Sequence, residues 1–457
     1  NKARFFTGAR EDLGSIIFIN SGPTSSLLAS NGRYFTGFSI RPGQRSPLAT
    51  LASHVGINFR QMPNGVSTTR NNRPPGLSQR YIFLTLVSSI AVAADEEAPE
   101  PGFNEPTFKG LGFRSIGPAF TAGRIADIAV DPTDRSTWYV AVGSGRVWKT
   151  SNRCTTWEPI LEDEDSYSTG CITIDPNSPN TIRLGTGENV SGRHVGYGNG
   201  VYRSRDGGQN WENMGLEASE RIGMIRIDPR DSKTIFVAAQ GPLWSGGGER
   251  GLFKSTDGGE NWRKVLGDGL GNTDIDDQYT GVSEVHMDRR DPDVMYAVSL
   301  QRLRNVSVLL DGGPGTGIHK SDDGGETWRE LPEGLPEENR GKTGLAISPQ
   351  DPDVLYATRE LANREGGFWR SADGGETWEK RNEYLSSGTG PHYYQELFAS
   401  PHKFDRVYQM DVNLHVTEDG GENFIKLDHE TKHVDHHAMA FDPNDEDYLL
   451  VGVDGGI

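Results

Sequence analysis

The sequence has few cysteines, a deficit of basic residues and no long hydrophobic run. Its 457 residues include two cysteines, Cys154 and Cys171, and no CxxC pair, which excludes a disulfide-rich scaffold and a cysteine zinc site. The longest apolar stretch, 81–94, is too short for a membrane-spanning helix. Acidic residues outnumber basic ones by 18; the net charge is +8 over residues 1–94 and −26 after them. The acidic region after residue 94 lacks the cluster of basic residues that binding to nucleic acids requires. Its charge favours neutral or cationic partners.

Residues 62–94 have the features of a secretory signal peptide. Arg80 precedes the apolar stretch, Ala91-Val92-Ala93 matches a small-residue cleavage site, and Met62 is the only methionine before residue 214. The alternative is a buried strand or helix in a genuine N-terminal domain. We predict a secreted or periplasmic protein with no membrane span after cleavage. Its expected segments are an upstream or non-native, disordered extension over 1–61, a signal peptide over 62–94 and a linker over 95–106.

Glycine is abundant, with 58 residues, and much of it falls in a repeated turn. Ser204–Trp211 reads SRDGGQNW; near copies end at Trp262, Trp328 and Trp378, and degenerate copies end at Trp157 and Phe424. A second turn of the Asp-Pro type, such as Asp131-Pro132, alternates with it, and apolar stretches flank both turns. Four strands in each period of about 50 residues are the unit of a β-propeller. We predict an all-β propeller over 107–457, with six complete four-stranded blades and an incomplete seventh.

The repeated turn, S-x-D-x-G-x-T-W, resembles the Asp-box (BNR) repeat of sialidases, family 74 glycoside hydrolases and sortilin-type receptors. The Asp carboxylate can bind N–H groups of its own turn, and the final Trp can fill the space beside the hairpin. We therefore expect the box residues to be structural and not sugar platforms: Asp206, Trp211, Asp257, Trp262, Asp323, Trp328, Asp373, Trp378 and Asp419.

Other stretches, including Ile116-Gly117-Pro118-Ala119 and Gly200-Val201-Tyr202-Arg203-Ser204, are similar to secreted bacterial proteins described as glycosyl-hydrolase-like or sortilin N-terminal-domain proteins. Members of that group usually continue into further propeller sequence. The resemblance therefore implies that the propeller is truncated at its C-terminal end.

The face opposite the box turns is where propellers usually bind ligands, and its loops contain the candidate site. Counting back seven residues from each Asp-Pro-type turn gives the residues at the mouth of the central channel. Polar residues at or next to these positions, and in the longest loops of the same face, are Arg124, Glu188, Asn189, Arg193, Arg221, Trp244, Lys342, Tyr393, Tyr394, Asp435 and His436. We expect them to contact a glycan or peptide, in particular an anionic or hydroxyl-rich ligand. The alternatives are a channel lined by water and, for Trp244, a loop plug.

Three histidines lie within the five residues 433–437. In a strand, His433, Asp435 and His437 would share one face, where they could hold zinc or another divalent ion. Asp435 could equally orient a histidine for acid–base work, and a structural role is the third alternative. A divalent cation is thus possible, but no cofactor is required. Since Cys154 falls in a box turn and Cys171 begins a strand at the opposite face, we expect no disulfide between them.

Three functional classes remain: a glycan- or peptide-binding module, a glycoside hydrolase and a structural protein. Hydrolysis requires two carboxylates about 5–10 Å apart. The resemblance to family 74 implies a catalytic Asp just after the second strand of the first blade, but the sequence there is Ala141-Val142-Gly143-Ser144-Gly145. Gly123-Arg124-Ile125-Ala126 matches the first sialidase arginine motif only in part. We therefore predict a secreted binding module, with a sialidase-like or family 74-like hydrolase as the alternative.

Overall fold

The computed structural model describes residues 17–21, 24–28, 123–192, 195–383, 396–427 and 432–457. The chain divides into two compact units, Asn1–Phe113 and Arg114–Ile457. In the first unit, the described part is an antiparallel hairpin of β1 (Ile17–Ser21) and β2 (Thr24–Leu28). The predicted signal peptide and linker lie outside the described residues, so the assignment of segments before residue 107 stays a prediction. A search of the described helices finds none with the length and apolar character needed to cross a membrane.

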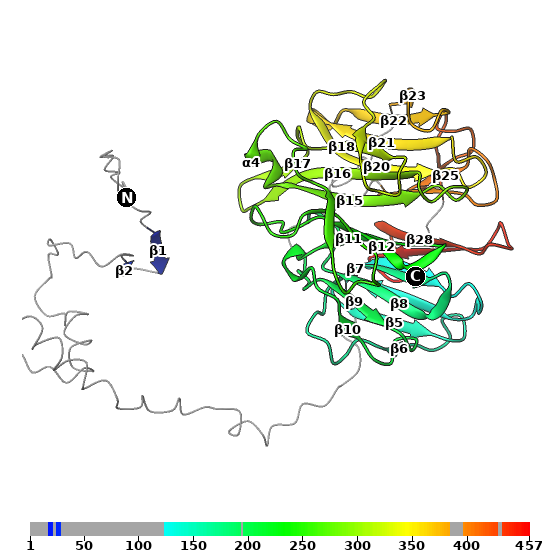
Figure 1. Cartoon of the computed structure of the whole chain (residues 1–457), viewed down its shortest axis with the longest axis horizontal. Coiled ribbons are helices and arrows are strands. Elements are labelled where there is room, and N and C mark those ends of the chain that lie inside the picture. Colours follow the sequence, from blue (N-terminus) through cyan, green and yellow to red (C-terminus); the bar gives the residue numbers. More distant parts are fainter. Residues whose placement is uncertain (1–16, 22–23, 29–122, 193–194, 384–395, 428–431) are drawn as a thin grey trace, which may run out of the picture. The chain divides into compact units, whose positions relative to one another are not determined.

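The second unit contains six four-stranded antiparallel sheets that follow one another around a ring (Figure 1). The first strand of each sheet is innermost, and it lies beside the innermost strand of the next sheet. The described helical turns are short: α4 (Asp274–Asp277) and the 3-10 turns η2 (Glu217–Ser219) and η3 (Ala362–Arg364). The predicted all-β propeller with six complete blades is confirmed.

Within each blade, the strands follow one another from the innermost to the outermost. Blade 1 is β3 (Ile125–Val130), β4 (Trp138–Val142), β5 (Arg146–Thr150) and β6 (Glu158–Pro159), and blade 2 is β7 (Thr169–Asp175), β8 (Ser178–Thr186), β9 (Val201–Ser204) and β10 (Glu212–Asn213). Blade 3 is β11 (Ile222–Asp228), β12 (Asp231–Ala239), β13 (Gly251–Ser255) and β14 (Arg263–Leu266), and blade 4 is β15 (Thr280–Met287), β16 (Met295–Arg304), β18 (Gly317–Ser321) and β19 (Arg329–Glu330), with β17 (Leu309–Asp311) also paired to β16. Blade 5 is β20 (Arg340–Ile347), β21 (Leu355–Leu361), β22 (Gly366–Ser371) and β23 (Glu379–Asn382), and blade 6 is β24 (Leu397–Ala399), β25 (Val407–Gln409), β26 (His415–Thr417) and β27 (Ile425–Lys426).

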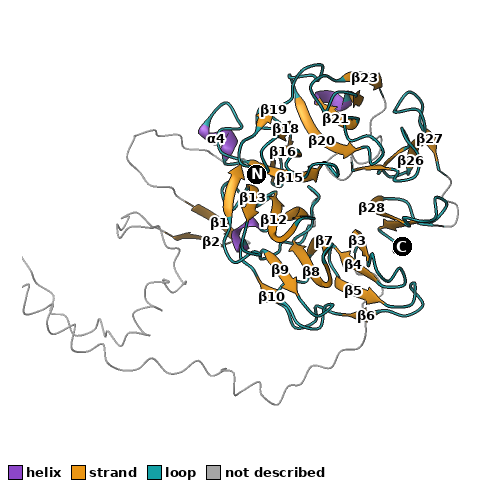
Figure 2. Ribbon diagram, turned by 45° about the vertical axis from the view of Figure 1, so that its right-hand side comes forward, coloured by secondary structure: helices purple, strands orange, loops and turns teal. Residues whose placement is uncertain are grey.

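The incomplete seventh blade is the pair β28 (His436–Phe441) and β29 (Leu449–Val453). Figure 2 shows β28 beside β3 of the first blade. Ala438 and Leu450 join a buried cluster with Ile125, Trp138 and Val140 of blade 1. On its other side, Met439 packs with side chains of blade 6. The pair therefore joins the last complete blade to the first.

Each box turn is held by its own side chains. In the turn of blade 3, Ser255 Oγ donates to Asp257 Oδ1 at 2.7 Å, and the Gly259 N–H donates back to Ser255 Oγ at 2.9 Å. The Asn261 N–H and Nδ2 donate to the two oxygens of Asp257 at 3.0 and 2.8 Å. These bonds, with the side chain of Asn261 contributing most, lower the pKa of Asp257 to about 2. Gly258 and Gly259 have φ of 85° and 98°, which only glycine adopts freely.

Two of the box tryptophans form hydrogen bonds to the preceding blade. Trp211 Nε1 donates to the Ile160 carbonyl at 2.6 Å, and Trp262 Nε1 donates to the Met214 carbonyl at 2.7 Å. Each of these carbonyls belongs to the preceding blade. We call such a bond an indole latch, because it ties one blade to the one before it.

Candidate functional site at the loop face

Three long loops interlock on the face opposite the box turns, which we call the loop face. They connect β8 to β9, β12 to β13 and β16 to β18. Val190, Val195 and Leu243 form one buried cluster between the first two loops. The third loop joins them through Arg304, whose backbone N–H donates to the Leu243 carbonyl at 2.8 Å and whose guanidinium donates to the Ser191 carbonyl at 2.7 Å. The loop face is therefore a packed surface and not three separate loops.

Buried arginines hold these loops in place. Arg250 donates to the carbonyls of Gly247 and Ser245 at 2.7 and 2.6 Å, within its own loop. Arg302 donates to the Gly241 carbonyl at 3.1 Å. Burial lowers the pKa of Arg250 to about 10 and that of Arg302 well below its ordinary value. Arg250 was not predicted from the sequence as an organiser of this face, because carbonyl acceptors leave no pattern in the sequence.

A cluster of polar and charged side chains, the mouth cluster, lies where blades 1, 2 and 7 meet. Its members are Arg124, Ser144, Glu188, His437 and Asp454. Arg124 Nη1 contacts Glu188, and Arg124 Nε lies 3.6 Å from Asp454 Oδ1. Ser144 Oγ donates to Glu188 Oε1 at 2.7 Å, and His437 Nε2 lies 2.9 Å from Asp454 Oδ1. One guanidinium thus links two carboxylates, and each carboxylate has a further polar partner.

The electrostatics of the mouth cluster favour a neutral His437 beside an ionised Asp454. Burial lowers the pKa of His437, and the hydrogen bond with Asp454 opposes this only in part. For Asp454, burial acts to raise the pKa, but the hydrogen bond with His437 and the charge of Arg124 outweigh it and hold the pKa below its ordinary range. Asp454 is 38% exposed, so this carboxylate can be reached from solvent.

The central channel holds a cavity of about 240 Å³ lined by the innermost strands. A register shift interrupts the pairing of six innermost strands at or next to a residue that lines the cavity: Ala126, Gly170, Gly223, Ser283, Lys342 and His437. Charged side chains from different blades also line it, namely Asp127, Arg226, Glu284, Lys342 and Glu396.

Two of these acids connect adjacent blades. Asp127 of β3 accepts from the Ile172 N–H of β7 at 2.9 Å, and Glu284 of β15 accepts from the Leu345 N–H of β20 at 3.1 Å. They thereby satisfy backbone groups that face a neighbouring blade and not a paired strand. A charge inside an apolar strand, as in Ile125–Val130, was the sequence signal that could have revealed them.

The environment of Glu396 favours the protonated form of its carboxyl group. Burial raises its pKa to about 8. The nearby Lys342 opposes this shift, whereas Glu284 and Asp127 add to it. Its carboxyl group can therefore donate a hydrogen bond into the cavity.

The structure distributes the predicted ligand residues over several sites. Asn189 and Lys342 line the channel cavity, and Arg124 and Glu188 form the mouth cluster. Arg221 is fully buried at the loop face, where its guanidinium pairs with Glu220 at 2.8 Å. Trp244 is 44% exposed beside the buried Leu243. Arg193, Tyr393 and Tyr394 lie outside the described residues.

The five-residue histidine segment is not a regular strand, which breaks the predicted alternation. Asp435 has a φ of 67°, β28 begins only at His436, and a register shift follows at His437. His437 therefore turns to Asp454, while His436 is buried with Nδ1 3.0 Å from the Asp411 carbonyl. His433 Nδ1 and Asp435 Oδ2 are 4.0 Å apart. Within the described residues, no three His, Cys, Asp or Glu side chains are grouped as metal ligands, so the divalent cation stays a prediction.

Both cysteines are free, with Cys154 exposed and Cys171 buried. This agrees with the expectation that they do not form a disulfide. Burial raises the pKa of the Cys171 thiol, so it stays protonated.

Comparison with known proteins identifies similar xyloglucanases but no matching family model. The chain is 26% identical over 221 residues to an oligoxyloglucan-reducing end-specific xyloglucanase of Emericella nidulans, which is 46% of this chain and 24% of that protein. It is 27% identical over 236 residues to xyloglucanase Xgh74A of Acetivibrio thermocellus, which is 46% of this chain and 26% of that protein. The matched region thus spans about a quarter of the length of these relatives.

Solved structures with the same fold include two GH74 proteins. The GH74 xyloglucanase of Xanthomonas campestris superposes with a TM-score of 0.54 at 16% identity, covering 75% of this chain and 52% of that chain. The GH74 enzyme of Niastella koreensis gives a TM-score of 0.52 at 17% identity, covering 74% and 52%. At this level of identity, the likeness establishes the propeller fold.

Proposed function

We propose that the protein is a glycoside hydrolase that acts on xyloglucan or a related β-glucan. The sequence alone left this reading as the alternative, and the relatives now favour it over a module that only binds. The two curated relatives are xyloglucanases, and the most similar regions cover nearly half of this chain.

The position of Glu188 is the observation that carries the proposal. The resemblance to family 74 implies a carboxylate just after the second strand of blade 1, where this chain has Gly143 and Ser144. Glu188 comes from the β8–β9 loop of blade 2, and it fills this corner. Ser144 Oγ donates to it, and a Cβ on Gly143 would lie 2.9 Å from Glu188 Oε1. A carboxylate supplied by the neighbouring blade thus takes the place of the absent aspartate.

Asp454 provides the second carboxylate. Both carboxylates contact the same guanidinium group, that of Arg124, and glycosidases use a pair of carboxylates close to one bond of the substrate. Asp454 is ionised at neutral pH, and His437 orients it. An ionised carboxylate in this position can stabilise the positive charge that develops on the sugar during hydrolysis.

Exposed aromatic side chains of the loop face suit a polysaccharide. Tyr167, Tyr197 and Trp244 are 48%, 67% and 44% exposed, and all three belong to loops on the loop face. Exposed aromatic rings offer broad faces on which sugar rings pack. The loop face therefore supports a chain of sugar units as substrate better than a single small molecule.

The test is release of reducing sugar from xyloglucan by the purified protein and by Glu188→Gln and Asp454→Asn variants. Each substitution keeps the shape of the side chain and removes its charge, and we expect each to lower the rate at least 100-fold. Glu217→Gln, at an exposed position of η2, is the matched control and should keep full activity. Binding of xyloglucan without any release would contradict hydrolysis and support the binding module. Equal rates for Glu188→Gln and Glu217→Gln would remove Glu188 from the site.

A further inference from the structure

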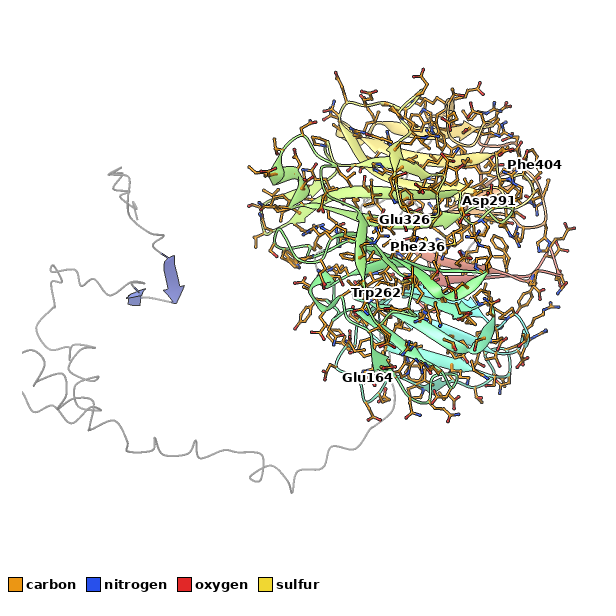
Figure 3. All side chains as sticks on the ribbon, in the orientation of Figure 1. Glu164, Phe236, Trp262, Asp291, Glu326 and Phe404 are labelled. Carbon is orange, nitrogen blue, oxygen red and sulfur yellow. The ribbon has the colours of Figure 1, made fainter. Side chains whose placement is uncertain are left out.

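A second pocket lies between blades 3 and 4, far along the chain from the mouth cluster. It has a volume of about 440 Å³, within the range of roughly 300–1,000 Å³ found for ligand sites. Its walls come from β14 and the loop 267–270 on one side, and from β18, β19 and the box turn of blade 4 on the other. Glu326, labelled in Figure 3, is one of its lining residues.

A pocket of about 600 Å³ lies at the equivalent place between blades 1 and 2, beside Trp211, and comparison of the blades shows how the lining of the pocket between blades 3 and 4 differs. The third strand of each blade has a side chain at one equivalent position, opposite the fourth strand: Trp148, Tyr202, Phe253, His319, Trp369 and His415. Tyr202, Phe253 and Trp369 are buried in the clusters between blades. Blade 4 instead has His319, a smaller and polar ring, which lines the pocket.

The indole latch is also missing at this interface. Trp328 Nε1 donates to the Gly325 carbonyl of its own turn at 3.2 Å, and not to blade 3. The equivalent acceptor would be Val265, three residues after Trp262, just as Ile160 and Met214 follow Trp157 and Trp211. However, the pairing of β13 with β14 shifts from Leu266 to Lys264, so Val265 is the extra residue of a bulge. Trp328, without a hydrogen bond to blade 3, and His319 both line the pocket.

His319 presents a hydrogen-bond acceptor to the pocket. Its side chain is only 5% exposed, and Nε2 lies 2.9 Å from Ser299 Oγ. Ser299 Oγ donates its single proton to the Gly315 carbonyl at 2.6 Å, so His319 Nε2 must be the donor to Ser299. Nδ1 then has a lone pair, and among the described residues it has no hydrogen-bond partner. Burial lowers the pKa of His319 to about 4, so this lone pair is present at neutral pH.

The charges around the pocket are already compensated. Asp268 pairs with Lys264 at 2.8 Å, Glu326 pairs with Lys254 at 2.6 Å, and Glu330 pairs with Arg340. Each carboxylate that lines the pocket is thus paired with a basic side chain, and Glu326 also pairs with Arg263 at 2.8 Å. Trp328 also lines the pocket, and the hydrogen-bond acceptors there are His319 Nδ1 and the carboxylate oxygens.

We propose that the pocket between blades 3 and 4 binds a neutral pyranose unit of a polysaccharide, packed on the indole of Trp328 with hydroxyl groups donating to His319 and Glu330. Hydroxyl donors match the acceptors, and the C–H face of a sugar ring matches the electron-rich face of the indole. This site is independent of the mouth cluster and hydrolyses nothing. It would hold the protein on its polysaccharide while the loop face acts.

The test is an NMR titration of protein labelled with ¹⁵N-tryptophan. The probes are xyloglucan heptasaccharide, cellotetraose and xylotetraose. The indole N–H signal of Trp328, assigned from its absence in Trp328→Phe, should shift on addition of at least one probe. His319→Phe restores the aromatic residue that blade 3 has at Phe253, so it should fold, fill the pocket and weaken this response at least tenfold. His415→Phe makes the same change in blade 6 and should leave the response unchanged.

The outcomes separate this proposal from the proposed function. Glu188→Gln should abolish sugar release without changing the Trp328 titration. His319→Phe should weaken the Trp328 titration without changing sugar release from short soluble substrates. A Trp328 signal that does not move with any probe at millimolar concentration would overturn the pocket. An unchanged titration in His319→Phe would overturn it too, and neither result would touch the hydrolase assignment.

Discussion

The indole latches allow one quantitative prediction about stability. Trp211, Trp262 and Trp378 occupy equivalent positions, but only the first two donate Nε1 to a carbonyl of the preceding blade, at 2.6 and 2.7 Å. Trp378 is 5% exposed, and its Nε1 is buried without a hydrogen-bond acceptor among the described residues. Replacement by Phe removes the N–H in all three cases together with a similar part of the ring. The three variants differ in what happens to one hydrogen bond, and Trp378→Phe also loses more packing, because Trp211 and Trp262 are only partly buried.

The expected difference follows from the cost of each change. Trp211→Phe and Trp262→Phe each lose a hydrogen bond with a net contribution of about 0.5–1.5 kcal/mol. Trp378→Phe instead removes a buried donor whose lack of a partner costs about 1–3 kcal/mol in the native state. We expect Trp378→Phe to be more stable than the other two variants by about 1.5–4.5 kcal/mol in the free energy of unfolding, the sum of these two terms, reduced by the larger packing loss at the buried Trp378.

Urea denaturation followed by circular dichroism is the assay, because it does not depend on tryptophan fluorescence. The midpoints can be compared directly only if the free energy of unfolding falls with urea concentration at a similar slope in all three variants. If Trp378→Phe lowers the stability as much as Trp211→Phe and Trp262→Phe do, the idea that the latches distinguish the blade interfaces is wrong.

Three further predictions concern titration, reactivity and metal. The pKa of Glu396 is about 8 in the folded state and 4.5 ordinarily, so between these pH values the folded protein retains a proton that the unfolded protein releases. The free energy of unfolding should therefore fall as the pH rises from about 4.5 to 8. Glu396→Gln should remove this part of the pH dependence, as measured by denaturation at a series of pH values. Iodoacetamide should label Cys154 alone in the native protein and both cysteines in guanidinium, because Cys171 is buried and its pKa is raised; mass spectrometry showing two labels in the native protein would contradict the buried position. Metal analysis with and without Asp435→Ala tests the divalent cation, which a metal-free native protein would exclude.

Much of the fold could be predicted from the sequence because its signals are local. The turn Ser255–Trp262 is held by bonds between its own residues, so its pattern repeats wherever the turn recurs. Strand number and blade order then follow from the spacing of two kinds of turn. The free state of Cys154 and Cys171 was predicted in the same way, from their places in the repeat.

The site depended on features that no local pattern contains. Counting residues back from each turn assumed regular strands, but register shifts interrupt the innermost strands near Ala126, Gly223 and His437, and they change which side chains face the channel. Asp127 and Glu284 are therefore in the channel, while Arg221 is under the loops.

By itself, the sequence determined the repeat, the turns and hence the all-β propeller. Only the tertiary structure decided that Glu188 fills the corner at Ser144, that Asp454 reaches Arg124, and that His319 faces a pocket beside Trp328. The physical reason is the range of the interactions. A turn is stabilised by hydrogen bonds between residues up to four apart, so its composition is visible in the sequence. A site is assembled from side chains of different blades, which meet only because the ring brings their strands together.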